Sequence, residues 1–206
     1  SEKFKDILEG NSFLSMYKYG EEFENLFSEY IGTKGAVACS SGTSALELIF
    51  ESINVRGKEV VVPSNTFLAT VIAIRNAGGI PVFADCNDDM CLDYKSAISK
   101  VTSITAAICI VHIGGIVSGS TIPLKEYCEN NGLHLVEDAA QAHGSSLNGI
   151  NAGNFGTAGA FSFFSTKVMT TGEGGMVTTN SDLLIQKMKS MREFGKVKTD
   201  VYINYH

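Results

Sequence analysis

The sequence contains little positive charge, and no part of it is strongly basic. Lysine and arginine together number 16, against 22 aspartates and glutamates, so the formal net charge is -6. No stripe of lysine and arginine with interleaved aromatic residues offers the electrostatic footprint that nucleic acid requires. We therefore expect no nucleic-acid partner.

Long apolar runs are also missing. The apolar stretches are short and are interrupted by Gly, Asp and Ser, so none is long enough to span a bilayer. The first ten residues, SEKFKDILEG, lack the apolar segment of a secretory signal. These absences predict a cytoplasmic chain without a membrane partner. At 44% hydrophobic and 18% charged residues, the 206-residue chain can bury a sizeable core, and we expect one large domain.

Signatures of disulfide and metal sites are absent as well. The five cysteines form no CxxC pair, and their odd number favours buried, reduced thiols. The acidic turn DCNDDMCLD (85–93) has the composition of a calcium loop but lacks the central Gly and the terminal Glu that such loops require. We interpret it as a solvated turn and predict no metal site.

The sequence does contain a regular alternation of short apolar runs and helical segments. Apolar residues recur at helical spacing in EEFENLFSEYIG (21–32), where Gly32 ends the helix. Strands are expected at 36–39, 59–62, 81–85, 106–112 and 134–138, and helices at 43–53, 66–78 and 121–131. This order predicts an α/β fold of three layers, a mostly parallel sheet with helices on both faces.

The pattern changes after residue 156. GTAGAFSFF (156–164) and GGMVTTN (174–180) are expected to be strands close in sequence, followed by a helix at 181–195. Such a pair predicts one antiparallel strand in the otherwise parallel sheet. The tail KVKTDVYINYH (196–206) ends without a closing element and the first residue is Ser, so both ends suggest a piece of a longer protein.

Open α/β sheets bind ligands beyond the carboxyl ends of their strands, so the junctions after the strands are informative. In CSSGTSALEL, Gly42 allows close backbone approach, and the helix start at Thr43 favours an anion such as phosphate, unless the Ser and Thr residues only cap the helix. The turn matches neither the GxxxxGK[ST] nor the GxGxxG pattern, which weakens a nucleotide-binding interpretation. In VPSNTFLAT, Phe67 could stack on a flat ring or pack in the core.

The third junction is HLVEDAAQAHG. It delivers Glu137 and Asp138 from an apolar strand to the same edge, with Gln141 and His143 a short step on. A carboxylate here could be catalytic or could cap the next segment. His143 taken alone is expected to be a structural histidine with satisfied hydrogen bonds.

The fourth junction lies in FSFFSTKVMTTGEGGMVTTN (161–180), where Ser162 alternates with two phenylalanines and Lys167 precedes a glycine-rich run. Lysines are usually exposed. A buried amine with a lowered pKa is what Schiff-base chemistry needs, because only the neutral amine attacks a carbonyl. The four junctions together offer a phosphate cradle, an aromatic face, a carboxylate and an amine, which are the parts that pyridoxal 5'-phosphate (PLP) uses.

At this point the chain resembles the DegT/DnrJ/EryC1 aminotransferases, fold type I PLP enzymes that act on nucleotide-linked keto-sugars. YGEEFENLFSEYIGTKGAVACSSGTSALEL, VVVPSNTFLATVIAIRNAGGIPVFAD, HLVEDAAQAHGSSLNG and FSFFSTKVMTTGEGGMVTTN resemble its segments in its order, across essentially the whole chain. The resemblance implies that Lys167 forms the Schiff base and that Asp138 holds the pyridine nitrogen. It further implies that Gln141 lies near the ring hydroxyl, that Gly42, Thr43 and Ser162 bind the phosphate, and that Phe67 stacks on the ring.

The implied activity is transfer of an amino group from an amino acid, typically L-glutamate, to a nucleotide-linked keto-sugar. The resemblance also implies a homodimer and a smaller C-terminal domain that this chain lacks, so residues 1–206 are expected to be the large PLP-binding domain. Lysine at 167 argues against the relatives that carry histidine there and dehydrate sugars. The HIGGIVSG segment (112–119) departs from the tyrosine-containing version of many members. Two alternatives stay open: a related PLP reaction, for example on a cyclic keto acid, and a non-catalytic cofactor-binding fragment.

Overall fold

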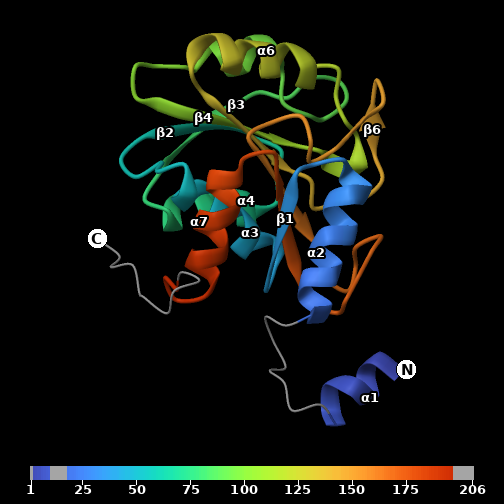
Figure 1. Cartoon of the computed structure of the whole chain (residues 1–206). Helices are drawn as coiled ribbons and strands as arrows, with labels where there is room; N and C mark the ends of the chain where they lie inside the picture. The colour runs from blue at the N-terminus through green and yellow to red at the C-terminus, as the bar shows by residue number, and fades with distance from the viewer. Residues whose placement is uncertain (1, 10–17, 197–206) are drawn as a thin grey trace.

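The structure is a computed structural model that describes residues 2–9 and 18–196 (Figure 1). Most of the tail 196–206, on which one expectation rested, lies outside the described residues. The helices are α1 (Glu2–Glu9), α2 (Lys18–Ile31), α3 (Gly42–Ser52), α4 (Leu68–Asn76), α5 (Tyr94–Ser99), α6 (Thr121–Asn131) and α7 (Asp182–Arg192). The strands are β1 (Gly35–Cys39), β2 (Glu59–Pro63), β3 (Ile80–Ala84), β4 (Thr105–Val111), β5 (His134–Asp138), β6 (Ser146–Leu147), β7 (Ile150–Asn151), β8 (Ala158–Ser162) and β9 (Gly175–Thr179).

Seven of these strands form one sheet in the order β1-β9-β8-β5-β4-β2-β3. Strand β9 runs antiparallel to both of its neighbours, β1 and β8, whereas the other neighbouring strands pair in parallel. The prediction of one antiparallel strand in a parallel sheet is therefore confirmed.

Helices cover both faces of this sheet, as the alternation of elements predicted. On one face, α3, α4 and α7 pack on a core that includes Val60 and Val177. On the other face, α5 and α6 pack around Ile108, while α2 covers Phe161 at the β1 end. Figure 1 shows α6 on one side of the sheet and α3 and α4 on the opposite side. The side chains that alternate along each buried strand thus supply one apolar cluster on the first face and two on the other.

Helices α1 and α5 and the hairpin of β6 and β7 were not expected. Helix α5 has six residues and begins after Asp93, whose side chain accepts a hydrogen bond from the Ser96 amide at 2.7 Å. The hairpin of β6 and β7 turns at Asn148 and Gly149, which both have positive φ. An Asn-Gly pair is a strong hairpin signal, so this turn was visible in the sequence.

The state of the cysteines and the lengths of the helices agree with the expectations drawn from the composition. All five cysteines are free thiols, and Cys91, Cys109 and Cys128 are buried, where burial raises their pKa. Among the helices of residues 2–9 and 18–196, none combines the length and the apolar character needed to cross a membrane.

Candidate active site

The ends of three strands meet at one edge of the sheet. Gly175, the first residue of β9, pairs with both Cys39 at the end of β1 and Ser162 at the end of β8. Asp138 ends β5 and pairs with Val111 and with the middle of β8. Because β1, β5 and β8 point the same way, the segments that follow them emerge side by side, as expected at the carboxyl edge of an α/β sheet.

The turn between β1 and α3 is packed tightly on both sides. A Cβ at Gly42 would lie 2.8 Å from the Ser162 Cβ, and a Cβ at Gly175 would lie 2.1 Å from the Ser41 carbonyl oxygen. Ser41 is the N-cap of α3, and its hydroxyl accepts the Ser44 amide at 3.1 Å. The first amides of a helix have no intrahelical acceptor, so the amides of Gly42 and Thr43 stay available. Helix capping and anion binding are therefore compatible at this turn.

Asp138 is a buried carboxylate with a defined hydrogen-bond environment. Its Oδ2 accepts the Thr70 hydroxyl at 2.7 Å, and its Oδ1 accepts the Ala140 amide at 3.2 Å. Burial raises the pKa of Asp138, while these hydrogen bonds and the charges of His112 and Lys167 act in the opposite direction. The carboxyl group thus lies in a place where a bound cation would offset the cost of burying its charge.

Thr70 was not singled out in the sequence. It is fully buried in α4, and its hydroxyl lies 2.8 Å from that of Thr66, one turn earlier. The available signal was two threonines four residues apart at the start of an otherwise apolar helix. Such a pair places both hydroxyls on the helix face that looks towards Asp138.

Phe67 stands at the N-cap position of the same helix. Its side chain is 71% exposed, so the alternative of a core phenylalanine is wrong. The Thr70 amide donates to the Phe67 carbonyl at 3.1 Å, and Thr70 in turn donates to Asp138. Thr70 therefore connects the backbone of Phe67 to the Asp138 carboxyl group through two hydrogen bonds.

Lys167 lies in a loop that closes on itself. The Phe163 amide donates to the Gly174 carbonyl at 2.8 Å, and the Thr171 amide donates to the Phe163 carbonyl at 3.0 Å. Lys167 is half-buried, and its charge contributes to lowering the pKa of His143 and acts on that of Asp138. The Lys167 loop therefore lies close enough to Asp138 for the lysine charge to act on the carboxyl group.

His143 differs from the expectation. Its ring lies 5.3 Å from the rings of both Phe161 and Phe163, measured between centroids. Neither ring nitrogen makes a hydrogen bond of normal geometry among the described residues, although the Ser162 backbone is close enough to raise the pKa of the ring, so the expected satisfied hydrogen bonds are not found. Burial first, and the Lys167 charge second, lower the pKa of this imidazole.

Gln141 is exposed, and the oxygen of its side-chain amide is held by a hydrogen bond. The Gly114 amide donates to the Gln141 Oε1 at 2.7 Å. With the oxygen so occupied, the amide nitrogen is the end left to donate to a ligand. This orientation comes from the HIGGIVSG segment, in which both Gly114 and Gly115 have positive φ.

Glu137 has a structural role, unlike Asp138, the next residue in the chain. Its carboxylate is fully buried and accepts the amides of Gly153, Phe155 and Gly156 at 2.7, 2.7 and 2.8 Å. The His112 Nε2 lies 3.0 Å from its Oε2. Adjacent strand residues point to opposite faces, so Glu137 and Asp138 could not both reach one ligand. Both acids lie at the end of β5, the edge expected from the sequence, and Glu137 is the one that is engaged in buried structural hydrogen bonds.

We expect Glu137→Ala to destabilise the fold by about 3–5 kcal/mol, because four buried donors would lose their acceptor. Urea unfolding followed by circular dichroism measures this change. Replacement of the exposed Glu29 by alanine is the control and should change stability by less than about 0.5 kcal/mol. A similarly small loss of stability in both variants would contradict the structural role of Glu137.

Known proteins share this architecture. The model of the DegT/DnrJ/EryC1/StrS aminotransferase family matches residues 1–205. GDP-perosamine synthase of Vibrio cholerae is 37% identical over 194 residues, covering 93% of this chain and 53% of the relative. L-glutamine:2-deoxy-scyllo-inosose aminotransferase of Streptomyces kanamyceticus is 37% identical over 180 residues, covering 86% of this chain and 42% of the relative.

A solved structure agrees equally well. The structure of S. venezuelae DesV in complex with a ketimine intermediate superposes with a TM-score of 0.91 at 32% identity, covering 98% of this chain and 56% of that one. The chain spans about half the length of the curated relatives it matches. The match of the family model along almost the whole chain, together with the fold, shows that this chain belongs to the DegT/DnrJ/EryC1/StrS aminotransferase family.

Proposed function

We propose that the protein containing this chain is a PLP-dependent aminotransferase that moves an amino group from L-glutamate to a nucleotide-linked keto-sugar. Membership of the family and relatives such as GDP-perosamine synthase support this proposal. The observation that carries it is the meeting of a half-buried lysine, a buried aspartate and an open helix N-terminus at one sheet edge. Residues 1–206 would be the large cofactor-binding domain of that protein.

The residues present fit PLP. The turn at Gly42 lies so close to Ser162 that a Cβ would fill the space, which leaves the first amides of α3 to face an anion. Asp138 is a buried carboxyl group on which the Lys167 charge acts. When bound, PLP supplies a carbonyl carbon for a lysine amine and a pyridine ring that acts as an electron sink.

Each side chain then has a distinct task in the proposed site. The amides of Gly42 and Thr43, with the Ser162 hydroxyl, bind the phosphate, and the N-terminal end of α3 favours its negative charge. Asp138 keeps a proton on the ring nitrogen, since its two oxygens are oriented by Thr70 and Ala140.

The remaining residues orient the ring and move protons. Phe67 packs on the ring face and excludes water from it. Gln141 donates its amide nitrogen to the ring hydroxyl, because Gly114 holds its oxygen. Lys167 would hold the cofactor through its amine, and the same amine would accept and return the proton of the amino acid's α-carbon.

A second copy of the chain is the partner that we propose for the apolar surface beside this site. Leu68 is 63% exposed at the start of α4, and Val168 is 84% exposed next to Lys167. Apolar side chains gathered on a surface mark a contact with another protein. A homodimer, as the family resemblance implies, would cover them, and a cytoplasmic location would suit its substrates.

The test is amino transfer by the full-length protein supplied with PLP. We expect L-glutamate and a nucleotide-linked keto-sugar to yield 2-oxoglutarate and an aminated sugar nucleotide. A coupled enzymatic assay measures the 2-oxoglutarate, and mass spectrometry identifies the aminated sugar nucleotide. The name of the S. kanamyceticus relative favours a second candidate, transfer to a cyclic ketone. Turnover only with a cyclic ketone would establish that alternative. A protein that binds PLP but aminates neither ketone would be a non-catalytic binding protein, and the proposal would fail.

A further inference from the structure

The outer edge of β1 is held by two charged side chains. Within the described residues, β1 pairs with β9 alone, so its other edge has no strand beside it. Near the carboxyl end of this edge the Ala38 amide donates to the Glu24 Oε1 at 2.9 Å, and the Arg192 Nη1 donates to the Ala38 carbonyl at 2.8 Å. Glu24 comes from α2 and Arg192 from α7. The two side chains, which we call the edge clamp, thus take the hydrogen bonds that a neighbouring strand would make.

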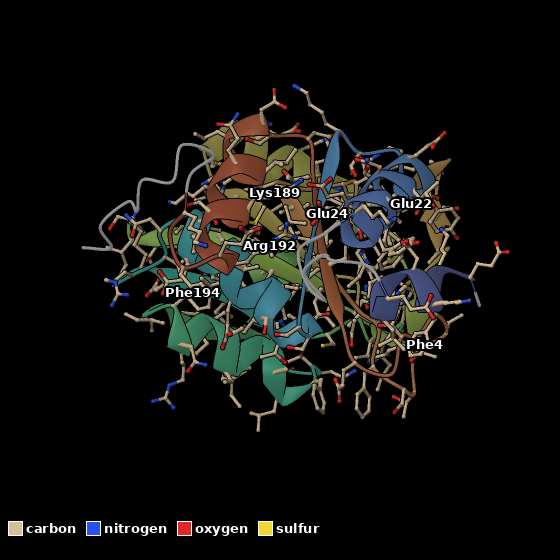
Figure 2. All side chains as sticks on the ribbon, turned by 60° about the horizontal axis from the view of Figure 1, so that its bottom comes forward. Phe4, Glu22, Glu24, Lys189, Arg192 and Phe194 are labelled. Carbon is tan, nitrogen blue, oxygen red and sulfur yellow. The ribbon has the colours of Figure 1, made fainter. Side chains whose placement is uncertain are left out.

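The edge clamp is an ion pair removed from water. Arg192 also binds Glu24 directly through Nη1, and the Lys189 ammonium lies 2.8 Å from the Glu24 Oε2 (Figure 2). The side chains of Glu24 and Arg192 are only 3% and 9% exposed. Burial opposes ionisation of Glu24, but Lys189, the Ala38 amide and Arg192 outweigh it and lower the pKa of Glu24. Both members of the edge clamp are therefore charged in the folded protein.

This ion pair lies directly before the turn assigned to the phosphate. Ala38 is two residues ahead of Ser40, where the turn begins. The turn is packed against Ser162 of β8 and Gly175 of β9 on its other sides. The edge clamp holds the side of β1 that no strand holds, and it links that strand to the first and last helices of the sheet domain.

We propose that Glu24 and Arg192 are positioning residues that set the turn 40–43 for the cofactor phosphate. This inference rests on the proposed function of that turn in binding PLP. The edge clamp acts through the backbone of β1 and not by touching the phosphate. Arg192 lines a cavity of about 340 Å³ together with Ser40, but the carboxylates of Glu47 and Glu51 line the same cavity and disfavour an anion there.

The test compares the binding of two vitamin B6 forms, PLP and pyridoxal, to a double variant that has the same net charge as the wild type. Glu24→Gln/Arg192→Met removes the donor to the Ala38 carbonyl and leaves no unpaired buried charge, so the fold should survive. We expect the affinity for PLP, titrated by absorbance, to fall about ten-fold, the size of one weakened charge-assisted hydrogen bond. The affinity for pyridoxal, which lacks the phosphate, should stay unchanged, because the rest of the site is not altered.

A matched control breaks another ion pair between α7 and the start of β1. Lys34→Met removes the Lys34–Asp182 pair, whose side chains are 55% and 61% exposed and do not contact Ala38. We expect this variant to bind both vitamers as the wild type does. Equal losses for PLP and pyridoxal in the double variant, or no loss for either, would overturn the positioning inference.

Amide hydrogen exchange separates this inference from the proposed function. The amides of Ser44 and Ala45 donate to the side chain and the carbonyl of Ser41, so they report on the turn without any cofactor. Their exchange should be faster in the double variant and unchanged in Lys34→Met. If the wild-type protein binds neither vitamer, the proposed function fails. In that case, unchanged exchange of the Ser44 and Ala45 amides in the double variant would refute the positioning role of the edge clamp. Faster exchange of these amides would support that role.

Discussion

Lys167→Ala is expected to abolish the yellow absorbance band that PLP forms with the wild-type protein and to lower amino transfer by roughly 10³-fold or more. The alanine removes the amine that binds the cofactor covalently and that moves the α-proton, and one positioned proton-transfer group contributes about 10²–10⁴ in rate. Borohydride treatment followed by peptide mass spectrometry gives a direct measurement. In the wild type the reduced cofactor should be found on the peptide that contains Lys167.

Lys100→Ala is the matched control for this experiment. Lys100 is exposed at the end of α5, far along the chain from the Lys167 loop. Its variant should keep the band, the labelled peptide and the rate. A label on a different lysine, or a band that persists in Lys167→Ala, would refute the assignment of the Schiff-base lysine.

Asp138→Asn is expected to lower amino transfer by roughly 10²-fold or more while the protein still binds PLP. Asparagine is neutral and cannot balance a proton held on the ring nitrogen, and removing one preorganised charge-stabilising group costs about this much. Its amide can still hydrogen-bond to both Thr70 and Ala140, which now bind the carboxylate. The rate measured at saturating PLP separates this effect from weaker cofactor binding.

The same substitution should stabilise the cofactor-free protein at neutral pH. Burial is the largest influence on Asp138 and raises its pKa above the unfolded value. A carboxyl group with a raised pKa contributes its full stability below the unfolded pKa, and this contribution is lost as the pH rises through the folded pKa. The gain from asparagine should therefore be present at neutral pH and vanish in acid. Thermal unfolding midpoints measured across pH would contradict this if the variant were less stable at every pH.

These two expectations for Asp138 have a common origin. A carboxylate kept out of water costs stability in the empty site, and that cost is what makes it attract a cation there. Stability and activity thus make opposite demands on one residue. Glu137, one position earlier, shows the contrasting case, in which four donors stabilise a buried acid and no ligand is needed.

Much of the fold follows from local pattern. The helix predicted at 121–131 and the strand at 134–138 agree with α6 and β5 at both ends, and the other predicted strands differ by one or two residues at an end. Short elements were missed because six residues, as in α5, give too few turns for a helical period to emerge. The antiparallel β9 was predicted because two strands so close in sequence leave no room for a crossover helix.

The sequence by itself determined the fold class and the residue types at each strand end, because apolar periodicity and glycine-rich junctions are local properties of the chain. Family membership also followed from the order of its motifs. Only the tertiary structure decided which neighbours share a face and which distant groups meet. It turned Glu137 away from Asp138, brought Thr70 to the aspartate across 68 residues, and joined Glu24 to Arg192 across 168. Such contacts depend on strand order and helix packing, which no local pattern encodes.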